Sequence, residues 1–298
     1  MASLRDIKRR IQSVKNTRQI TKAMKMVSGA KLKRATDRAV AARPYQESLS
    51  RVLGRVAAAA GDTITHPLLV QHEQVEKVLV VVMGSDRGLC GSFNGNIFRR
   101  LERHIEKERE GGKTVSLRTF GKKARGHFGR RNYNIVSSVT DLTFLGYADA
   151  ALVLADQLSA EFANGDVHEV WLAYNYFKSA GTQIPTITRL LPLSVAAGGK
   201  DGGAAAPQGG AAGSVEYKYE PDGQRLLDIL LPMQLRTILL QALLDTEAGE
   251  HAARMAAMDN ATRNAGDLIS SLTLEYNRGR QAAITKELIE IVSGAEAI

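Results

Sequence analysis

Cysteine, proline and aromatic residues are scarce in this chain, and each scarcity narrows the class of protein. The single cysteine, Cys90, excludes an internal disulfide bond, so the chain does not require an oxidising compartment. An aromatic content of 5% and only 7 prolines in 298 residues favour long helices over a large all-β core. No uninterrupted apolar run approaches the roughly 18 residues of a bilayer-spanning helix.

Acidic residues are scarce in the first 60 residues, which hold 15 Lys and Arg against three acids. Charge is nearly balanced in residues 61–220, which hold 18 basic and 17 acidic residues. Residues 221–298 hold 7 basic and 11 acidic residues. The basic surplus therefore indicates an acidic partner for the N-terminal segment alone. Nucleic acid, anionic lipid and an acidic protein surface all fit that description. The N-terminal MASLRDIKRRIQ lacks the apolar segment of a secretory signal, and we expect it to belong to the mature protein.

Residues 1–60 predict one long helix, because apolar residues recur at helical spacing and Pro44 is the only proline. The apolar stripe consists of Leu4, Ile7, Ile11 and Val14, then Ile20, Met24 and Val27. The stripe is thin and is expected to change phase between Val14 and Ile20. A helix with so narrow a stripe needs a partner along a seam.

Residues 76–219 predict an α/β domain of Rossmann-like type, because strand-like and helix-like segments alternate. The expected strands are 77–83, 115–120, 134–139, 167–177 and 184–193, and the expected helices are 93–110, 122–131 and 147–164. A largely parallel sheet follows from this order. The tract 196–214 has 14 Gly or Ala among 19 residues and predicts a flexible excursion without a core of its own.

Residues 221–298 predict a second long helix, with Pro232 expected to kink it or restart it. A heptad is visible, with Met255, Thr262, Ile269, Tyr276 and Ala283 on one position and Met258, Ala265, Leu272 and Gly279 on the other. Ile284, Leu288 and Ile291 are expected to extend its apolar seam. Two such helices are too long for a domain of about 150 residues, roughly 40 Å across, to cover. We therefore expect them to pair as an antiparallel coiled coil and to project from that domain.

Motifs of catalysis are nearly absent from the sequence. No P-loop, dinucleotide-binding, nucleophile-elbow or zinc-protease motif occurs, and the six histidines have no ligand-like spacing. The best candidate is the turn GSDRGLCG at 84–91, because a glycine turn before a helix can cradle phosphate. The favoured interpretation is structural, with the glycines permitting a tight strand-to-helix turn. We expect no catalytic, metal-binding or cofactor-binding residues.

Four stretches of the sequence stand out: ITKAMKMVSGAKLKRA at 20–35, SDRGLCGSFN at 85–94, EHAARMAAMDNATRNA at 250–265 and YNRGRQAAITKELIEIVSGA at 276–295. All four closely resemble the gamma subunits of F-type ATP synthases. The similarity covers essentially the whole chain in the same order. The main departure is the tract 196–214, and the dithiol insertion of chloroplast gamma subunits is missing.

The resemblance implies a non-catalytic central-stalk rotor without a cofactor. It would couple rotation of the membrane c ring to ATP synthesis or hydrolysis in the alpha and beta ring, with the epsilon subunit beside its α/β domain. A delta subunit and an inhibitory protein are possible further partners. The resemblance places the chain at the cytoplasmic face of the bacterial inner membrane as a peripheral protein.

The resemblance also carries over six contact residues, which are Met24, Arg254, Arg280, Gln281, Thr285 and Glu287. Met24 matches the position near an acidic loop of the beta subunit, and Arg254 matches an arginine that contacts the catalytic ring. The other four match contacts between shaft and beta subunit. Apart from the resemblance, two alternatives stay open. They are a nucleic-acid binder that uses the basic helix, although Tyr45 is the only aromatic residue there, and a nucleotide-using enzyme built on the 84–91 turn.

Overall fold

The computed structural model describes residues 4–60, 66–194 and 222–296. The chain divides into two compact units: unit 1 combines 1–31 with 254–298, and unit 2 comprises 32–253. The predicted Gly/Ala-rich excursion at 196–214 lies outside the described residues. Helices α1 and α5 each contribute residues to both units, so the N-terminal part of α1 and the C-terminal part of α5 belong to the same unit.

Helix α1 runs from Leu4 to Ala60 and α5 from Gly223 to Glu296, which confirms both predicted long helices. Of the two outcomes expected at Pro232, the restart is wrong, because α5 is one continuous helix through that residue, and the kink stays a prediction. A proline removes only one backbone donor and displaces one carbonyl. Leu231 and Leu235 on either side are fully buried, and their packing holds the helix across the defect.

Unit 2 contains a five-stranded sheet with the order β3-β2-β1-β4-β5. Its strands are β1 (Lys77–Met83), β2 (Thr114–Phe120), β3 (Ile135–Val139), β4 (Glu169–Ser179) and β5 (Thr182–Leu191). Strands β1 to β4 pair in parallel, and β5 lies antiparallel to β4 at one edge. All five predicted strands are therefore present, with shifted ends, and the largely parallel sheet is confirmed.

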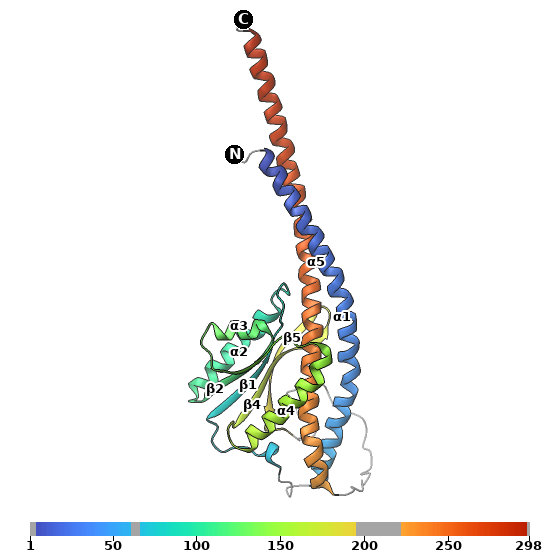
Figure 1. Ribbon diagram of the computed structural model, residues 1–298, viewed down its shortest axis with the longest axis vertical. Helices are drawn as coiled ribbons and strands as arrows, with labels where there is room; N and C mark the ends of the chain where they lie inside the picture. The colour runs from blue at the N-terminus through green and yellow to red at the C-terminus, as the bar shows by residue number, and fades with distance from the viewer. Residues whose placement is uncertain (1–3, 61–65, 195–221, 297–298) are drawn as a thin grey trace. The chain divides into compact units, whose positions relative to one another are not determined.

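Helices cover both faces of this sheet (Figure 1). Helices α2 (Phe93–Glu110) and α3 (Lys122–Gly129) pack on the face formed by Val78, Val80 and Val82. Helix α4 (Tyr147–Ala163), preceded by the short helix η3 (Phe144–Gly146), packs on the face formed by Leu79, Val81 and Met83. Alternate side chains of β1 thus supply two cores, as a strand buried on both faces requires.

The second core also holds the parts of α1 and α5 that belong to unit 2. Leu227, Leu231, Leu235 and Leu239 recur every four residues along α5 and are buried there. One 18-residue window of α5 is apolar enough, with a mean hydropathy of 1.4, to cross a membrane by length and composition. Since these leucines pack against α4 and the sheet, we assign the stretch to the core of unit 2.

Candidate functional site

The 84–91 turn is closed by its own side chains. The amide of Asn94 donates from Nδ2 to Ser85 Oγ at 2.7 Å, and its Oδ1 accepts the Ser85 backbone N–H at 3.0 Å. Ser85 Oγ donates in turn to the carbonyl of Arg87, and Cys90 is buried beneath the turn. The backbone N–H and the hydroxyl of Ser85 are therefore occupied internally and are not available to a phosphate.

The carboxylate of Asp86 lies within the turn and is bound by other parts of the domain. Its Oδ1 accepts the backbone N–H of Lys122 at the start of α3, and its Oδ2 accepts the N–H of Asp141. The turn itself leads into α2 at Phe93, and a carboxylate within the turn would repel an anion bound there. This geometry favours the structural interpretation of the glycine turn over the phosphate-binding alternative.

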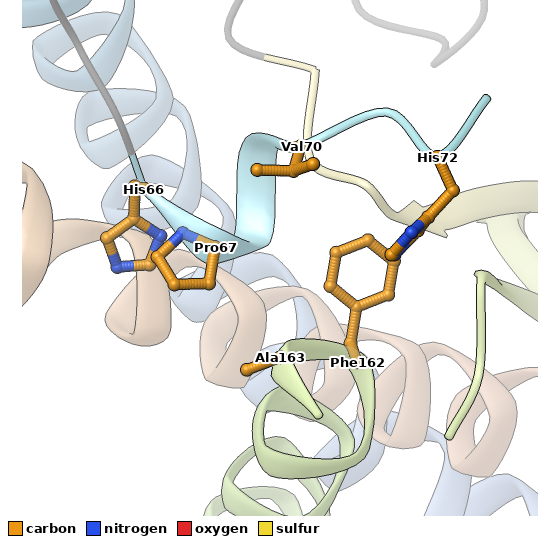
Figure 2. Close-up of a pocket in the computed structure, with 6 residues that line it drawn as sticks. All are labelled: His66, Pro67, Val70, His72, Phe162 and Ala163. Carbon is orange, nitrogen blue, oxygen red and sulfur yellow. The ribbon is translucent and has the colours of Figure 1, made fainter. Parts of the chain in front are cut away.

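A pocket of about 330 Å³ lies beside α4 (Figure 2). Its lining consists of His66, Pro67, Val70, His72, Phe162 and Ala163. The imidazole of His66 accepts the backbone N–H of Leu68 at Nδ1, and burial lowers its pKa. The edge of the His72 ring meets Phe162. Among the described residues, no carboxylate, thiol or hydroxyl lines the pocket, and no group of three or more potential ligands could hold a metal ion.

The helices of unit 1 pack as an antiparallel pair with a fixed register. Leu4 lies against Gly279, where a side chain on the glycine would come within 3.0 Å of it. Thr262 Oγ1 donates to Thr21 Oγ1 at 2.8 Å, and Lys25 Nζ donates to Asp259 Oδ1 at 2.6 Å. As the residue number rises along α1, the number of its partner falls along α5, which confirms the predicted antiparallel pairing.

The α5 side of this seam follows the predicted heptad. Met258, Ala265 and Leu272 are buried, and Met255, Thr262, Ile269, Tyr276 and Ala283 are half-buried. The α1 side differs from the prediction, because the buried positions of α1 keep the same heptad spacing and do not change phase between Val14 and Ile20. Ile7, Val14, Thr21, Ser28 and Ala35 recur every seven residues and are buried or half-buried. Ile20 and Val27, which were assigned to the stripe, are 61% and 57% exposed.

The outer surface of α1 in unit 1 is strongly basic. Eight exposed cations have no ion-pair partner within the described part of the chain: Arg5, Lys8, Arg9, Arg10, Lys15, Arg18, Lys22 and Lys31. Ile20, Met26 and Val27 add exposed apolar side chains to the same helix. Such a surface suits an acidic partner that also offers apolar contact.

The six predicted contact residues all lie in unit 1, in three places. Met24 is half-buried beside the seam, and Arg254 is 6% exposed at the start of the unit. Arg280, Gln281, Thr285 and Glu287 lie together on the last turns of α5 and are exposed, with Thr285 Oγ1 donating to the Gln281 carbonyl. Their roles stay predictions.

The end of α5 carries an exposed apolar group that was wrongly assigned to the seam. Leu4, the first residue of α1, already lies at Gly279, whereas α5 continues to Glu296. Ile284, Leu288 and Ile291 are accordingly 49%, 57% and 67% exposed, and Ile289 is exposed beside them. Comparing the lengths of the two stripes could have revealed this, because the α5 pattern continues past the last possible α1 partner.

Comparison with known proteins gives a consistent result. The family described as ATP synthase matches residues 3–298. The ATP synthase gamma chain of Anaeromyxobacter sp. (strain Fw109-5) is 47% identical over 304 residues, and that of Paracoccus denitrificans (strain Pd 1222) is 46% identical over 302 residues; each alignment covers 100% of both chains. The fold is similar to a chain in the rotor of Euglena gracilis mitochondrial ATP synthase, with a TM-score of 0.62 and 20% identity over 94% of this chain and 98% of that one. The fold is also similar to a chain in the structure of the Tetrahymena thermophila mitochondrial ATP synthase central stalk and c ring. The TM-score is 0.60 and the identity is 24%, over 81% of this chain and 99% of that one.

Proposed function

This chain belongs to the ATP synthase gamma chain family, and we propose that its paired helices form the shaft that couples c-ring rotation to catalysis in the alpha and beta ring. The gamma chain is the central-stalk rotor and a non-catalytic subunit of F-type ATP synthase. The observation that carries the proposal is the antiparallel packing of α1 and α5 in unit 1. The residues between the two helices are buried or half-buried, and the outer surface is basic and partly apolar.

A shaft that transmits torque must resist sliding of one helix along the other. Polar contacts at Thr21–Thr262 and Lys25–Asp259 fix the register, because a shift by one residue would leave their partners misaligned. The close approach of Leu4 to Gly279 adds a steric stop. These contacts support a pair of helices that turns as one body.

The cations of α1 and the apolar end of α5 suit different parts of the ring. The eight unpaired Lys and Arg side chains are complementary to acidic loops of the beta subunits, which Met24 would approach. Apolar residues of the alpha and beta subunits would bury the exposed side chains of Ile284, Leu288, Ile289 and Ile291. The same subunits would contact Arg280, Gln281, Thr285 and Glu287. Arg254, which is 6% exposed, is proposed as a further contact with the ring.

The remaining partners and the location follow from family membership. We place the epsilon subunit and the c ring against the α/β domain, and a delta subunit or an inhibitory protein elsewhere in the complex. Because relatives at 44–47% identity are bacterial proteins, we place the complex at the cytoplasmic face of the bacterial inner membrane, with this chain as a peripheral subunit. The nucleic-acid alternative receives no support from family membership.

Substitution of Met24 by lysine tests the coupling role. The added cation beside a basic face strengthens attraction to an acidic beta loop, so each rotational step has to break an extra charge contact. We expect ATP-driven ion pumping to fall more than ATP hydrolysis, measured on the same membranes. Met26→Lys is the matched control, because Met26 is 68% exposed on the same helix but does not match the family contact. Equal loss of pumping and hydrolysis in Met24→Lys would contradict the assigned role.

A further inference from the structure

The segment of the α/β domain that holds α2 and α3 and the segment that holds α4 carry opposite charge. Residues 84–131, which include α2 and α3, hold 13 Lys and Arg against five acids. Residues 132–177, which include η3 and α4, hold six acids and no Lys or Arg. Since α2 and α3 pack on one face of the sheet and α4 on the other, the basic and acidic surfaces point in opposite directions.

Half of the acids in 132–177 are neutralised within the fold. Glu161 accepts from Arg118, Asp141 pairs with Lys122, and Glu169 lies 3.7 Å from the Lys113 ammonium. The exposed Asp149 and Asp156 on α4 have no ion-pair partner in the described part of the chain. Of the three acids that remain unpaired, these two lie on the outer surface of α4, and the third, Asp166, lies in the loop that follows it.

Exposed apolar residues occupy the same surface. Leu152 is 37% exposed and Val153 is 54% exposed, and they lie between Asp149 and Asp156 at spacings of three, four and seven residues. Residues at these spacings share one side of a helix. Leu145 in η3, four residues before Asp149, is 86% exposed. We call these five residues the α4 face: Leu145, Asp149, Leu152, Val153 and Asp156.

Folding alone does not account for the α4 face. Asp149 lies in the first turn of α4, where a carboxylate stabilises the helix start. Asp156 lies in the middle of the helix, where that benefit has decayed. A single exposed apolar residue is ordinary, but an apolar centre flanked by charges has the layout of a protein interface, with a dry core and a polar rim.

We propose that the α4 face is a docking surface for another protein of the assembled complex, one that presents an apolar side chain flanked by Lys or Arg. Asp149 and Asp156 are seven residues apart, so the two partner cations would lie about 10 Å from one another, or two turns apart on a helix. An anionic membrane surface is disfavoured, because this layer of the domain would repel it. The inference rests on the proposed function, since the partner is a subunit of the same complex.

A photo-crosslinking residue at Val153 in the purified complex tests the proposal. We expect an adduct with one other subunit, in a segment where Lys or Arg flanks an apolar residue on both sides. The double variant D149K/D156K should lower the adduct yield about tenfold, because two attractions become repulsions. The milder D149N/D156N should lower it less and guards against a folding defect. Glu106→Lys and Glu110→Lys on α2 are the controls, and they should leave the yield within about twofold.

The outcomes separate this inference from the proposed function. If the complex assembles and hydrolyses ATP but Val153 gives no adduct, only the docking surface is wrong. An adduct with lipid, with a second copy of this chain, or with a segment lacking Lys and Arg would also overturn it, as would unchanged yield in D149K/D156K. If the chain fails to purify with alpha and beta subunits, the proposed function fails and this inference with it.

Discussion

The guanidinium of Arg43 in α1 lies 3.4 Å from the carboxylate of Asp245 in α5, and Asp245 is fully buried. Arg43 also donates to the carbonyl of Phe177 in β4. Gln241 Nε2 donates both to Asp245 Oδ1 and to the carbonyl of Ala39. One buried cluster therefore ties the two long helices to the sheet within unit 2.

Burial raises the pKa of Asp245 to about 6, although Arg43 and Gln241 oppose the rise. Because the folded-state pKa exceeds the unfolded value near 4, protonation stabilises the fold. This contribution is fully present below about pH 4 and is lost as the pH rises through about 6. We expect Asp245→Asn to remove this pH dependence and to stabilise unit 2 at pH 7.5, by on the order of 3 kcal/mol.

Denaturant unfolding between pH 4 and 8 measures this effect. Asp259→Asn is the control, because its carboxylate is exposed and the pKa is lowered by the hydrogen bond from Lys25. The stability that Asp259 contributes is therefore lost as the pH falls, which is the opposite sign. The same pH profile in Asp245→Asn and in the unmodified chain would show that Asp245 does not titrate as inferred.

Gly121 is expected to be the glycine of the domain least tolerant of alanine. Its φ is +89°, and a Cβ atom there would lie 2.5 Å from the carbonyl oxygen of Gly84. Gly112 has a similar φ of +79°, with nothing within 4 Å of the added atom. Gly112→Ala should cost about 1–2 kcal/mol from backbone strain alone. Gly121→Ala should cost about 2 kcal/mol more, because backbone has to move. Equal denaturant midpoints for the two variants would contradict this.

The register of the seam predicts unequal effects of two truncations in unit 1. Leu272 is buried at 5% exposure, and Leu272→Ala should cost about 2–4 kcal/mol. Ile20→Ala should stay within about 0.5 kcal/mol, because Ile20 faces outward. Hydrogen exchange of the α1 amides at 14–28 reports the local stability. Faster exchange in Ile20→Ala than in Leu272→Ala would contradict this register. It would support the change of phase between Val14 and Ile20 that the sequence predicted.

Deletion of residues 284–298 separates the roles of the seam and the end of α5. Since Ile284, Leu288 and Ile291 are exposed and lie past the Leu4–Gly279 contact, α1 should keep its exchange protection. The assembled complex should form and should turn over ATP more slowly, because contacts to the ring are lost. Fraying of α1 in the deletion variant would show that these residues do belong to the seam.

The sequence allowed the α5 seam to be predicted and the α1 seam only in part, for a physical reason. On α5 the seam positions are apolar or small, as at Met258, Ala265 and Leu272. On α1 the seam passes through Thr21 and Ser28, whose burial becomes favourable only once a partner helix supplies hydrogen bonds such as that from Thr262. A hydropathy pattern therefore selected the outward-facing Ile20 and Val27.

The α/β domain was more predictable, because runs such as 77–83 are β-branched and glycine turns separate them. The antiparallel direction of β5 depends on pairing with β4 and has no local signature. The candidate contacts at 280–287 came from the resemblance alone. Their exposure on the end of α5 is consistent with contact to a partner, whereas the α4 face emerged only when exposure and charge could be seen together.

Direct observation of rotation tests the central claim. Cys90 is buried, so a cysteine introduced at the exposed Glu110 provides a selectively reactive attachment point for a probe. With the alpha and beta ring fixed to a surface, addition of ATP should turn the probe in one direction, in steps that stop when ATP is removed. Sustained ATP hydrolysis by the same complex with a stationary probe would contradict the account of this chain as the rotor.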